Sequence, residues 1–531
     1  MALDIGRTAA EREVRRARVE GRPVPTVAIV GGGLSGLATA IQLVRCGIRS
    51  FTVVEQSDGV GGTWRDNVYP GAACDVPSHL YSFSFAPKTD WSRRFAEQPE
   101  ILDYAEDLVE RYHLHPHLRL SSTVVGARYD ETGDRWELTL RTPDGEEVLH
   151  ADTVVFACGQ LNRPHLPDIE GRDGFAGPSW HSARWDHSVD LTGKRVAVVG
   201  SGASAIQFVP PVAAVAGSTT IFQRSPSYVG PKKDRPYRAT TRTLLQRVGP
   251  LRAAYRWWIY WTLEARWLAF RRDSWAGRRF QELMATGIRE GVVCDRLPER
   301  SVVPDYPVGC KRILISNDWY PALLRPDVTV VDTPVTRIEA DAVVTADGVR
   351  HPADVLIFGT GFATTDFLAH LPVTGPGGRT LADAWAGGAH AYLGTAVAGF
   401  PNCYVLYGPN TNLGHNSILF MVERQLNLFL QALAVQTAGL GGRPAAVEVT
   451  GAAYDADDRS TQRRLGRTAW AGACTSWYKD ASGRITNNWP TWTVRYWWDT
   501  LRLRPADFDV TPTAPGPDGR AHQEIHAGSG A

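Results

Sequence analysis

The sequence of 531 residues is poor in the features that define several other classes of protein. Its seven cysteines are scattered, and no two stand at C-x-x-C or C-x-x-x-x-C spacing. That spacing argues against a disulfide scaffold, a zinc ribbon and a dithiol reductase. No apolar run of about 18 residues or more indicates a transmembrane helix, and the Arg- and Glu-rich start lacks the apolar stretch of a secretory signal. These absences predict a cytoplasmic protein without a bound metal.

An excess of charge of either sign is also lacking. The 57 basic residues nearly balance the 56 acidic ones, which argues against a globally basic nucleic-acid binder and against an acidic tail protein. Lysine is scarce, with only six residues, so a high arginine count alone says little about function. The length exceeds one ordinary core and predicts roughly three domains.

The first motif is a βαβ unit with a glycine-rich loop. An apolar strand at 26–30 runs into Gly31, Gly33 and Gly36, a helical pattern follows, and a strand at 51–54 ends at Glu55. Backbone N–H groups of such a loop and the helix N-terminus hold a pyrophosphate, and an acid at this offset accepts from ribose hydroxyls. The unit therefore predicts a site for FAD or NADH.

The same unit recurs with opposite charge at its end. A strand at 195–199 runs into Gly200, Gly202 and Ser204, and the next strand leads to Arg224. Gly31 precedes Glu55 by 24 residues, and Gly200 precedes Arg224 by 24 residues. An arginine can pair with a 2′-phosphate that an acid would repel, so Arg224, with Ser225 beside it, predicts NADPH.

Two dinucleotide sites in one chain indicate a flavin that is reduced by a nicotinamide cofactor. Because the sequence holds no redox dithiol, oxygen chemistry becomes the leading option for the reduced flavin. The predicted fold is α/β, with two Rossmann-like dinucleotide-binding domains and a helical insert in the NADP domain. The predicted segments are an N-terminal arm at 1–25, the FAD domain at 26–165 and 345–505, the NADP domain at 166–344 with its insert at about 231–300, and a disordered tail at 506–531.

The stretch 231–280 is both basic and aromatic. It holds 13 Lys or Arg against three acids, together with seven Trp and Tyr residues from Tyr255 to Trp275, and its apolar spacing suits helices. Three roles fit this composition. The stretch can form a lid that shapes the substrate pocket, an interface for another subunit, or a peripheral contact with a membrane surface.

Two longer motifs resemble a known family. Residues 61–64 (GGTW), Tyr69-Pro70-Gly71 and Asp75 resemble the long fingerprint of type I Baeyer–Villiger monooxygenases. Residues 175–186 resemble their second fingerprint, F-x-G-x-x-x-H-x-x-x-W-[P/D], at every fixed position. Related N-oxygenating enzymes usually end this motif in Tyr or Phe, where this sequence has Trp185. The resemblance spans roughly residues 25 to 500 and is weakest over the aromatic insert.

The resemblance implies FAD, NADPH and O2 acting through a C4a-peroxyflavin on a ketone, which becomes an ester or lactone. The family's G-x-K-R segment matches residues 309–312, so Arg312 is implied as the catalytic cation, Asp75 as its partner and Lys311 as a ligand of the 2′-phosphate. The apolar insert favours a bulky hydrophobic ketone. Neither the physiological ketone nor the oligomeric state can be read from the sequence.

The resemblance also implies further cofactor contacts. Gly62, Thr63, Trp64 and Tyr69 are expected beside the flavin, Asn410 late in the FAD domain near it, and His181 in a linker as a hinge. Segment 474–478 resembles a C-terminal Ser-Trp element, from which Trp477 would reach the NADP and substrate side.

Two rivals stay open at this point. A flavin monooxygenase that oxygenates N or S atoms shares the double dinucleotide plan but does not need Arg312. A flavin-binding sensor or scaffold would keep the fold without turnover, although Arg224, Lys311, Arg312 and Asp75 together argue against it.

Overall fold

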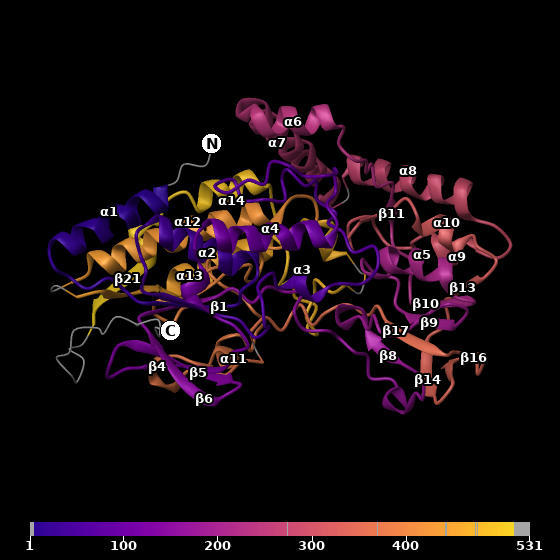
Figure 1. The fold of residues 1–531 in the computed structure, drawn as a ribbon, viewed down its shortest axis with the longest axis horizontal. Coiled ribbons are helices and arrows are strands. Elements are labelled where there is room, and N and C mark those ends of the chain that lie inside the picture. Colours follow the sequence, from indigo (N-terminus) through magenta and orange to yellow (C-terminus); the bar gives the residue numbers. More distant parts are fainter. Residues whose placement is uncertain are drawn as a thin grey trace.

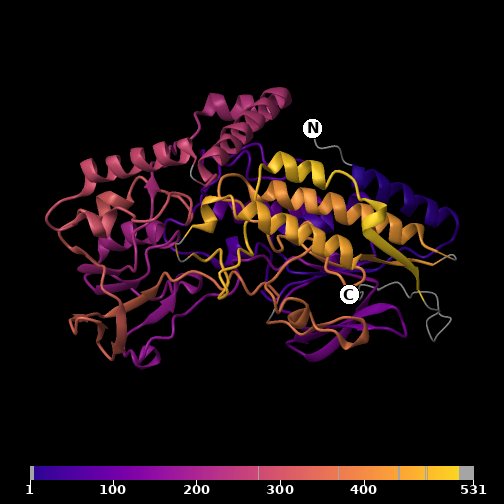
Figure 2. The ribbon, with the colours of Figure 1, turned by 180° about the vertical axis from the view of Figure 1, so that it is seen from behind.

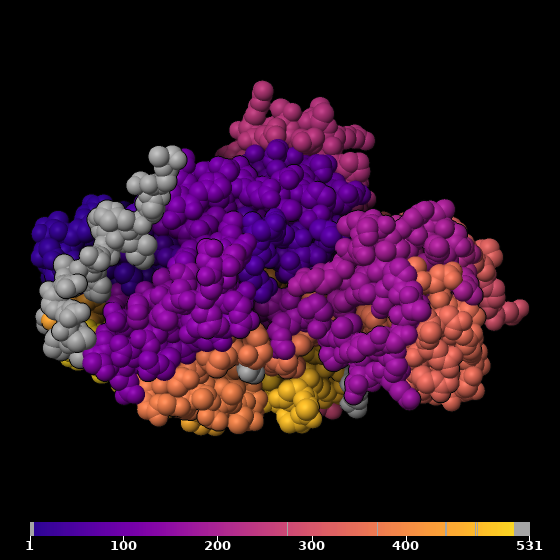
Figure 3. Space-filling view, turned by 60° about the horizontal axis from the view of Figure 1, so that its bottom comes forward, coloured from indigo at the N-terminus to yellow at the C-terminus, as the bar shows by residue number. Residues whose placement is uncertain are grey.

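The chain folds into two halves that lie side by side along the long axis of the molecule (Figure 1). The computed structural model describes residues 5–272, 274–368, 370–440, 443–472, 474 and 476–513. Each half is built on a five-stranded parallel sheet. Seen from below, C-terminal residues (yellow) reach the surface between the two halves (Figure 3).

The first half holds the N-terminal glycine loop. Its sheet has the order β19-β7-β1-β2-β3, and every pairing is parallel. The strands are β1 Val27–Val30, β2 Phe51–Val54, β3 Leu118–Arg119, β7 Thr153–Phe156 and β19 Cys403–Val405. All residues of β1, β2, β7 and β19 are buried, because helices and loops cover both faces of a parallel sheet.

The second half repeats this plan around the second glycine loop. Its sheet has the order β13-β10-β9-β17-β8, again with parallel pairings only. The strands are β8 Ser179–His181, β9 Arg195–Val199, β10 Ser218–Phe222, β13 Val328–Val331 and β17 Val355–Phe358. Helix α5 (Ala205–Val215) connects β9 to β10.

In each half an antiparallel meander precedes the strand that pairs with the first strand of the βαβ unit. The meanders are β4 Thr123–Asp130, β5 Arg135–Thr142 and β6 Gly145–Ala151 in the first half, and β14 Val335–Glu339, β15 Ala342–Thr345 and β16 Arg350–Pro352 in the second. Strand β17 is therefore the counterpart of β7. The expected return to the FAD domain at residue 345 is wrong, since β17 pairs with β9 and the chain crosses back only after Gly361.

Long helices cover the first half. They are α1 Ile5–Val19, α2 Leu34–Arg45, α4 Gln98–Arg111, α12 Ile418–Ala438, α13 Gly451–Leu465 and α14 Thr493–Asp499. From behind, the last three lie in front of the first sheet (Figure 2). By length and composition, helix α12 is apolar enough to cross a membrane. However, 83% of its apolar 18-residue stretch is buried inside the protein, as in a core helix.

The N-terminal arm is a docked helix. Helix α1 buries Ala10, Val14 and Ala17 against the first half, and the Gly6 N–H donates to Asn427 Oδ1 at 2.9 Å. The predicted N-terminal arm therefore contains a helix that is part of the first core.

The predicted helical insert is present and projects from the body between the halves (Figure 1). It consists of α6 Ala239–Arg247, α7 Gly249–Glu264, the 3-10 helix η4 Ala265–Phe270 and α8 Trp275–Val292. Although it leaves from the second half, α7 packs Ile259, Tyr260 and Leu263 into the core of the first. The insert therefore bridges the two halves.

The tail prediction is wrong for its first residues. Strand β21 (Phe508–Pro512) pairs antiparallel with β20 (Ala445–Val449). Phe508 is buried, and its ring meets Tyr392 edge-on at 5.6 Å, which holds the start of the strand on the first half. Residues 514–531 of the expected tail lie outside the described residues. The remaining short elements are α3 Thr63–Asp66, α9 Glu299–Val302, α10 Trp319–Leu323, α11 Leu381–Ala384, β11 Val229–Gly230, β12 Leu314–Ile315 and β18 Val373–Thr374.

Candidate active site

The first glycine loop has the backbone that a pyrophosphate site needs. Gly31 has a φ of +109°, and a Cβ there would lie 2.8 Å from the Ala157 carbonyl oxygen. A Cβ on Gly36 would lie 1.8 Å from the Gly31 oxygen, so helix α2 can approach the strand only with glycine there. No side chain caps α2 at Gly33, so its first N–H groups are free to bind an anion.

Glu55 is fixed at the end of β2, beside this loop. Its Oε2 accepts from the Gly32 N–H at 2.6 Å and its Oε1 from the Ser57 N–H at 2.8 Å. The side chain is buried, so the carboxylate has one orientation. This is the position from which an acid accepts from an adenosine ribose.

The family fingerprint forms a second wall against the glycine loop. The Gly61 N–H donates to the Gly32 oxygen at 3.1 Å, and a Cβ on Gly33 would meet the Gly62 Cα at 3.6 Å. Thr63 begins α3 at this point, and the Trp64 indole N–H donates to the Tyr81 hydroxyl at 3.1 Å. The structure thus brings Gly62, Thr63 and Trp64 to the first glycine loop.

The second glycine loop lies at the N-terminus of α5. No side chain caps this helix at Ser204, and a Cβ on Gly202 would meet only the Gly359 oxygen, at 4.0 Å. Both loops therefore leave the open, donor-lined space that a dinucleotide pyrophosphate occupies.

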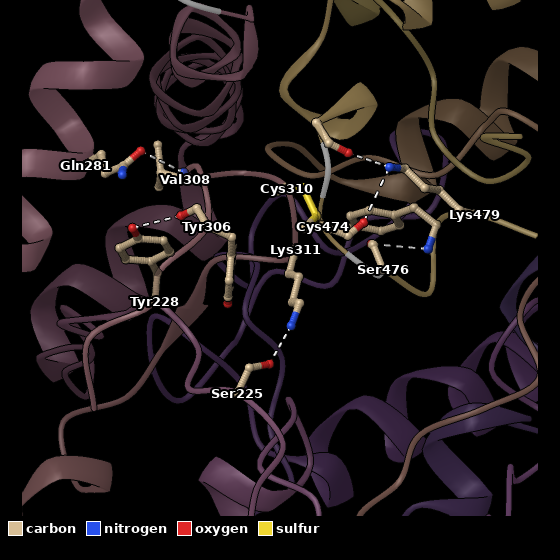
Figure 4. Close-up of a disulfide and its surroundings, with 12 residues drawn as sticks. Ser225, Tyr228, Gln281, Tyr306, Val308, Cys310, Lys311, Cys474, Ser476 and Lys479 are labelled. Carbon is tan, nitrogen blue, oxygen red and sulfur yellow. Dashed lines mark hydrogen bonds between the residues drawn. A yellow bond between two sulfur atoms is a disulfide. The ribbon is translucent and has the colours of Figure 1, made fainter. Parts of the chain in front are cut away.

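Cationic groups gather at the end of β10. The Lys311 ammonium donates to Ser225 Oγ at 2.5 Å, as the close-up shows (Figure 4). Burial lowers the pKa of Lys311, and the nearby Arg224 lowers it further. Within the described part of the chain neither Arg224 nor Lys311 forms an ion pair, so this cluster fits a dianionic 2′-phosphate.

The expected pair of Asp75 and Arg312 is present at the junction of the halves. Arg312 donates to one oxygen of Asp75, Oδ2, from Nε at 3.0 Å and from Nη2 at 2.5 Å. The Asp75 carboxylate is the main cause that raises the pKa of Arg312 above its usual value. Both side chains stay about a quarter to a third exposed, so the cation is fixed and still accessible.

Aromatic side chains surround this pair. Arg312 acts electrostatically on the buried phenols of Tyr407 and Tyr478, and burial raises the pKa of Tyr478 to about 12. Tyr478 belongs to a separate apolar cluster with Trp267 and Phe270 of the insert and with Trp470. We call these four side chains the aromatic wall.

Tyr69 lies at the boundary of the two halves. Its hydroxyl donates to Gln207 Oε1 on α5 at 3.0 Å, and its ring meets Phe208 and Trp185 at 5.9 and 6.5 Å. Gln207 Nε2 in turn donates to the Ala73 oxygen at 2.9 Å. The fingerprint turn therefore joins the two halves, and sequence motifs gave no sign of Gln207.

Asn410 and Trp477 hold the C-terminal loops. Asn410 Nδ2 donates to the carbonyl oxygens of Ile485 and Asn488, at 3.0 and 3.2 Å. The Trp477 carbonyl accepts from Thr364 Oγ1 and Asn487 Nδ2, both at 2.9 Å. The side-chain amide of Asn410 thus donates to carbonyl groups of the protein. Thr475 of the expected Ser-Trp element lies outside the described residues.

His181 ends β8, the edge strand of the second sheet. Its Nδ1 accepts from the Ala183 N–H at 3.1 Å, and its ring meets Phe362 at 5.6 Å. Phe362 lies on the chain's return crossing, which runs beside the outgoing one through the pairing of Pro164 with Phe362. Burial lowers the pKa of His181 to about 4, so its imidazole is neutral near pH 7, and the hinge role stays a prediction.

One feature contradicts the cysteine spacing argument. Cys310, in the G-x-K-R segment, forms a disulfide with Cys474, 164 residues away. Spacing rules detect only local pairs, and nothing in the sequence brings these two segments together. Among the described residues no group of three or more His, Cys, Asp or Glu side chains could hold a metal ion.

Fold and site together define a flavoprotein with two dinucleotide sites and a fixed arginine between them. Known proteins agree: the FMO-like family, described as flavin-binding monooxygenase-like, matches residues 25–248. A Baeyer–Villiger monooxygenase of Streptomyces coelicolor is 43% identical over 95% of this chain and 96% of its own. The chain belongs to the Baeyer–Villiger monooxygenase family.

Solved structures agree with this assignment. The complex of OTEMO with FAD and NADP matches 92% of this chain and 100% of its own with a TM-score of 0.81 and 26% identity. An oxidised steroid monooxygenase bound to NADP matches with a TM-score of 0.80 and 29% identity, at the same coverage. The predicted family, double dinucleotide fold and FAD- and NADPH-dependent enzyme class are confirmed, and the N- or S-oxygenating alternative is the less supported one.

Proposed function

We propose that this enzyme uses FAD, NADPH and O2 to convert a bulky hydrophobic ketone into an ester or lactone. The observation that carries the proposal is the Arg312 cation, fixed by Asp75 and placed next to the aromatic wall. A preorganised cation serves an oxygen that becomes negative in the transition state, and aromatic side chains favour an apolar ketone over a polar one.

The bound flavin supplies the activation of O2 with two electrons from NADPH. The side chains supply the electrostatic stabilisation and the orientation. Arg312 attracts the negative charge that develops on oxygen during attack on the ketone carbonyl. Asp75 holds the guanidinium in one orientation, because two N–H groups donate to the same carboxylate oxygen.

The cofactors are held by the two loops. Gly33 and Gly36, at the N-terminus of α2, offer N–H groups to FAD, Gly31 shapes the turn with its own N–H bonded to the Val54 oxygen, and Glu55 accepts from the ribose. At the second loop, Gly200, Gly202 and Ser204 line the NADPH pyrophosphate. Arg224, Ser225 and Lys311 bind its 2′-phosphate, since neither of the two cations forms an ion pair in the described part of the chain.

The insert acts as the lid over the substrate side. Trp267 and Phe270 of η4 face Trp470 at ring distances of 5.6 Å each. The lid is anchored on the first half by Glu264, whose carboxylate accepts from the Thr493 N–H at 2.6 Å and from Asn416 at 2.7 Å. One structural relative is named a steroid monooxygenase, and a steroid is the kind of bulky apolar molecule that the aromatic wall favours.

The test is a panel of cyclic, steroidal and long-chain ketones with NADPH, read as oxygen uptake and as a product mass increased by one oxygen atom. Esters or lactones from the bulky apolar members support the proposal. A matched pair of variants, Trp267→Ala in the wall and exposed Trp275→Ala outside it, separates the pocket from general effects. Sulfoxides or N-oxides without any ester would refute it.

We also propose that the insert touches an anionic membrane surface from a cytoplasmic location. Trp257, Trp258 and Trp261 on α7 are 43%, 54% and 53% exposed. All charged side chains from 235 to 263 are arginines, five of them on α6, α7 or their flanks. Exposed tryptophans beside arginines suit the headgroup region of anionic lipids.

Vesicle sedimentation tests this contact. The enzyme is expected to sediment with phosphatidylcholine vesicles only when they contain phosphatidylserine, and less so at high salt. Trp258→Ala with Trp261→Ala is expected to weaken sedimentation, whereas Val148→Ser on β6 is expected to change nothing. A dimer on gel filtration that dissociates with the same Trp variants, without sedimentation, would assign the face to a second copy instead.

A further inference from the structure

The disulfide between Cys310 and Cys474 joins segments from both parts of the active site. Their Cα atoms lie 6.4 Å apart, although 164 residues separate them. In the close-up, the bond lies directly above the side chain of Lys311, which points away toward Ser225 (Figure 4). The bond therefore lies at the start of the segment that carries Lys311 and Arg312.

The Cys310 side of the bond belongs to the second half. Cys310 is fully buried, and its N–H donates to the Pro307 oxygen at 3.1 Å. The Val308 N–H donates to Gln281 Oε1 of α8 at 3.1 Å, and the Lys311 ammonium lies 4.5 Å from the centre of the Tyr306 ring. This loop depends on the insert and supplies the phosphate ligand.

The Cys474 side of the bond belongs to the segment that continues into the aromatic wall. Lys479 Nζ donates to the carbonyl oxygens of Gly472, at 2.5 Å, and Cys474, at 3.3 Å. Two residues after Cys474, Ser476 starts the turn that leads to Trp477 and Tyr478. Through Trp477 this segment is bonded to Thr364 and Asn487 in the first half.

The two sulfurs differ in accessibility. Cys474 is half-buried, whereas Cys310 is not exposed at all. A peroxide molecule can therefore reach Cys474, with Cys310 buried behind it. Burial raises the pKa of Cys74, Cys158 and Cys403, which keeps those three thiols protonated.

We propose that Cys310 and Cys474 are a redox modification site that hydrogen peroxide closes and a small dithiol opens. The Cys474 thiolate attacks one oxygen of the peroxide and releases hydroxide, which gives a sulfenic acid. The Cys310 thiol then attacks that sulfur and expels water. In sum, two thiols and one peroxide give one disulfide and two waters, and the two thiols supply the two electrons.

The peroxide has a source in the enzyme's own class of reaction. NADPH and O2 that react without a ketone yield NADP⁺ and hydrogen peroxide, with the electrons of the hydride passed to oxygen. The reverse step needs a dithiol, which becomes a disulfide while the enzyme regains two thiols. The state of the pair therefore reports how much NADPH has been oxidised without product.

Closing the bond holds the Lys311 loop against the segment that leads to the aromatic wall. This consequence rests on the proposed NADPH site. We expect NADP⁺ to bind about tenfold more tightly to the closed form, since the closed loop is ordered before binding. A tenfold change is about 1.4 kcal/mol, the order of the free energy that fixes the backbone of one residue.

Counting thiols tests the modification independently of turnover. The holoenzyme is treated either with hydrogen peroxide or with a dithiol, then denatured and alkylated, and its mass is measured. All seven cysteines should be alkylated after the dithiol, and only the five free ones after peroxide, with a peptide that links residues 310 and 474. Seven alkylated residues in both states, or a link between other cysteines, would overturn the site.

Binding of NADP⁺ to the two forms tests the consequence. Cys474→Ser is expected to bind like the reduced wild type under both treatments, whereas Cys294→Ser, which removes an exposed free thiol, is expected to switch like wild type. Equal NADP⁺ affinity of both wild-type forms refutes the switch even when the thiol count changes. A protein that closes the bond but forms no ester refutes the proposed function and leaves the modification standing.

Discussion

Replacing Arg312 by alanine tests the catalytic centre most directly. Arg312 already makes both of its bonds to Asp75 before any substrate arrives, so it is a preorganised electrostatic group. Losing one such group typically costs about a hundredfold to a thousandfold in rate. We therefore expect ester formation by Arg312→Ala to fall by about that factor, while reduction of the flavin by NADPH, which depends on cofactor stacking, falls much less.

The assay separates the two half-reactions. Anaerobic stopped-flow absorbance follows flavin bleaching by NADPH, and product analysis in air follows ester and hydrogen peroxide. In Arg312→Ala, the electrons that reach oxygen should leave almost entirely as peroxide. Two neighbouring variants sharpen the result. Arg312→Lys should rescue little, because an ammonium lacks the planar fork, and Asp75→Asn should keep the cation but lose its orientation.

One result would refute this reasoning. If Arg312→Ala makes ester at nearly the wild-type rate, the guanidinium does not stabilise the reacting oxygen, and the assignment of the catalytic cation fails. The test does not depend on assay pH, since Asp75 raises the pKa of Arg312 and the cation persists over the whole usable range.

Three further predictions follow from other contacts. Arg224→Ala should remove most of the preference for NADPH over NADH, about tenfold to a hundredfold in the ratio of dissociation constants, because a hydrogen bond to a charged group contributes about 1.5–3 kcal/mol; an unchanged ratio would assign the phosphate to Lys311 alone. Glu264→Ala should leave the Thr493 and Asn416 donors unpaired and destabilise the protein by about 3–5 kcal/mol in denaturant unfolding, with early proteolysis in the insert. Burial raises the pKa of Asp457 from 3.8 to about 6, so the free energy of unfolding should fall by up to about 3 kcal/mol as pH rises from about 4 to about 6, and Asp457→Asn should abolish that part of the pH dependence.

The parts of the site that the sequence predicted are those fixed by local geometry. Glycine loops, Glu55 and Arg224 follow from strand–turn–helix units, in which a fixed spacing places each residue. The pairing of Asp75 with Arg312 was inferred from family motifs, and the structure brings the two side chains together across 237 residues of sequence.

The parts that were missed depend on contacts between distant segments. Strand β17 has the same apolar pattern whichever sheet it joins, so only its pairing with β9 shows where the second half ends. Tyr69 meets Gln207 and Cys310 meets Cys474 across the boundary of the halves, and no periodicity encodes such a meeting. Residues 508–512 look like a polar tail until β20 supplies a partner strand.

The interleaved order of the strands has a consequence for synthesis on the ribosome. All five strands of the second sheet lie between residues 179 and 358, in one continuous stretch of chain. The first sheet starts at Val27 but is complete only when β19, at residues 403–405, has emerged. We therefore expect the second half to close before the first, so that β7, at the open edge of the unfinished first sheet, stays exposed to aggregation and to chaperones until its partner β19 is made about 250 residues later.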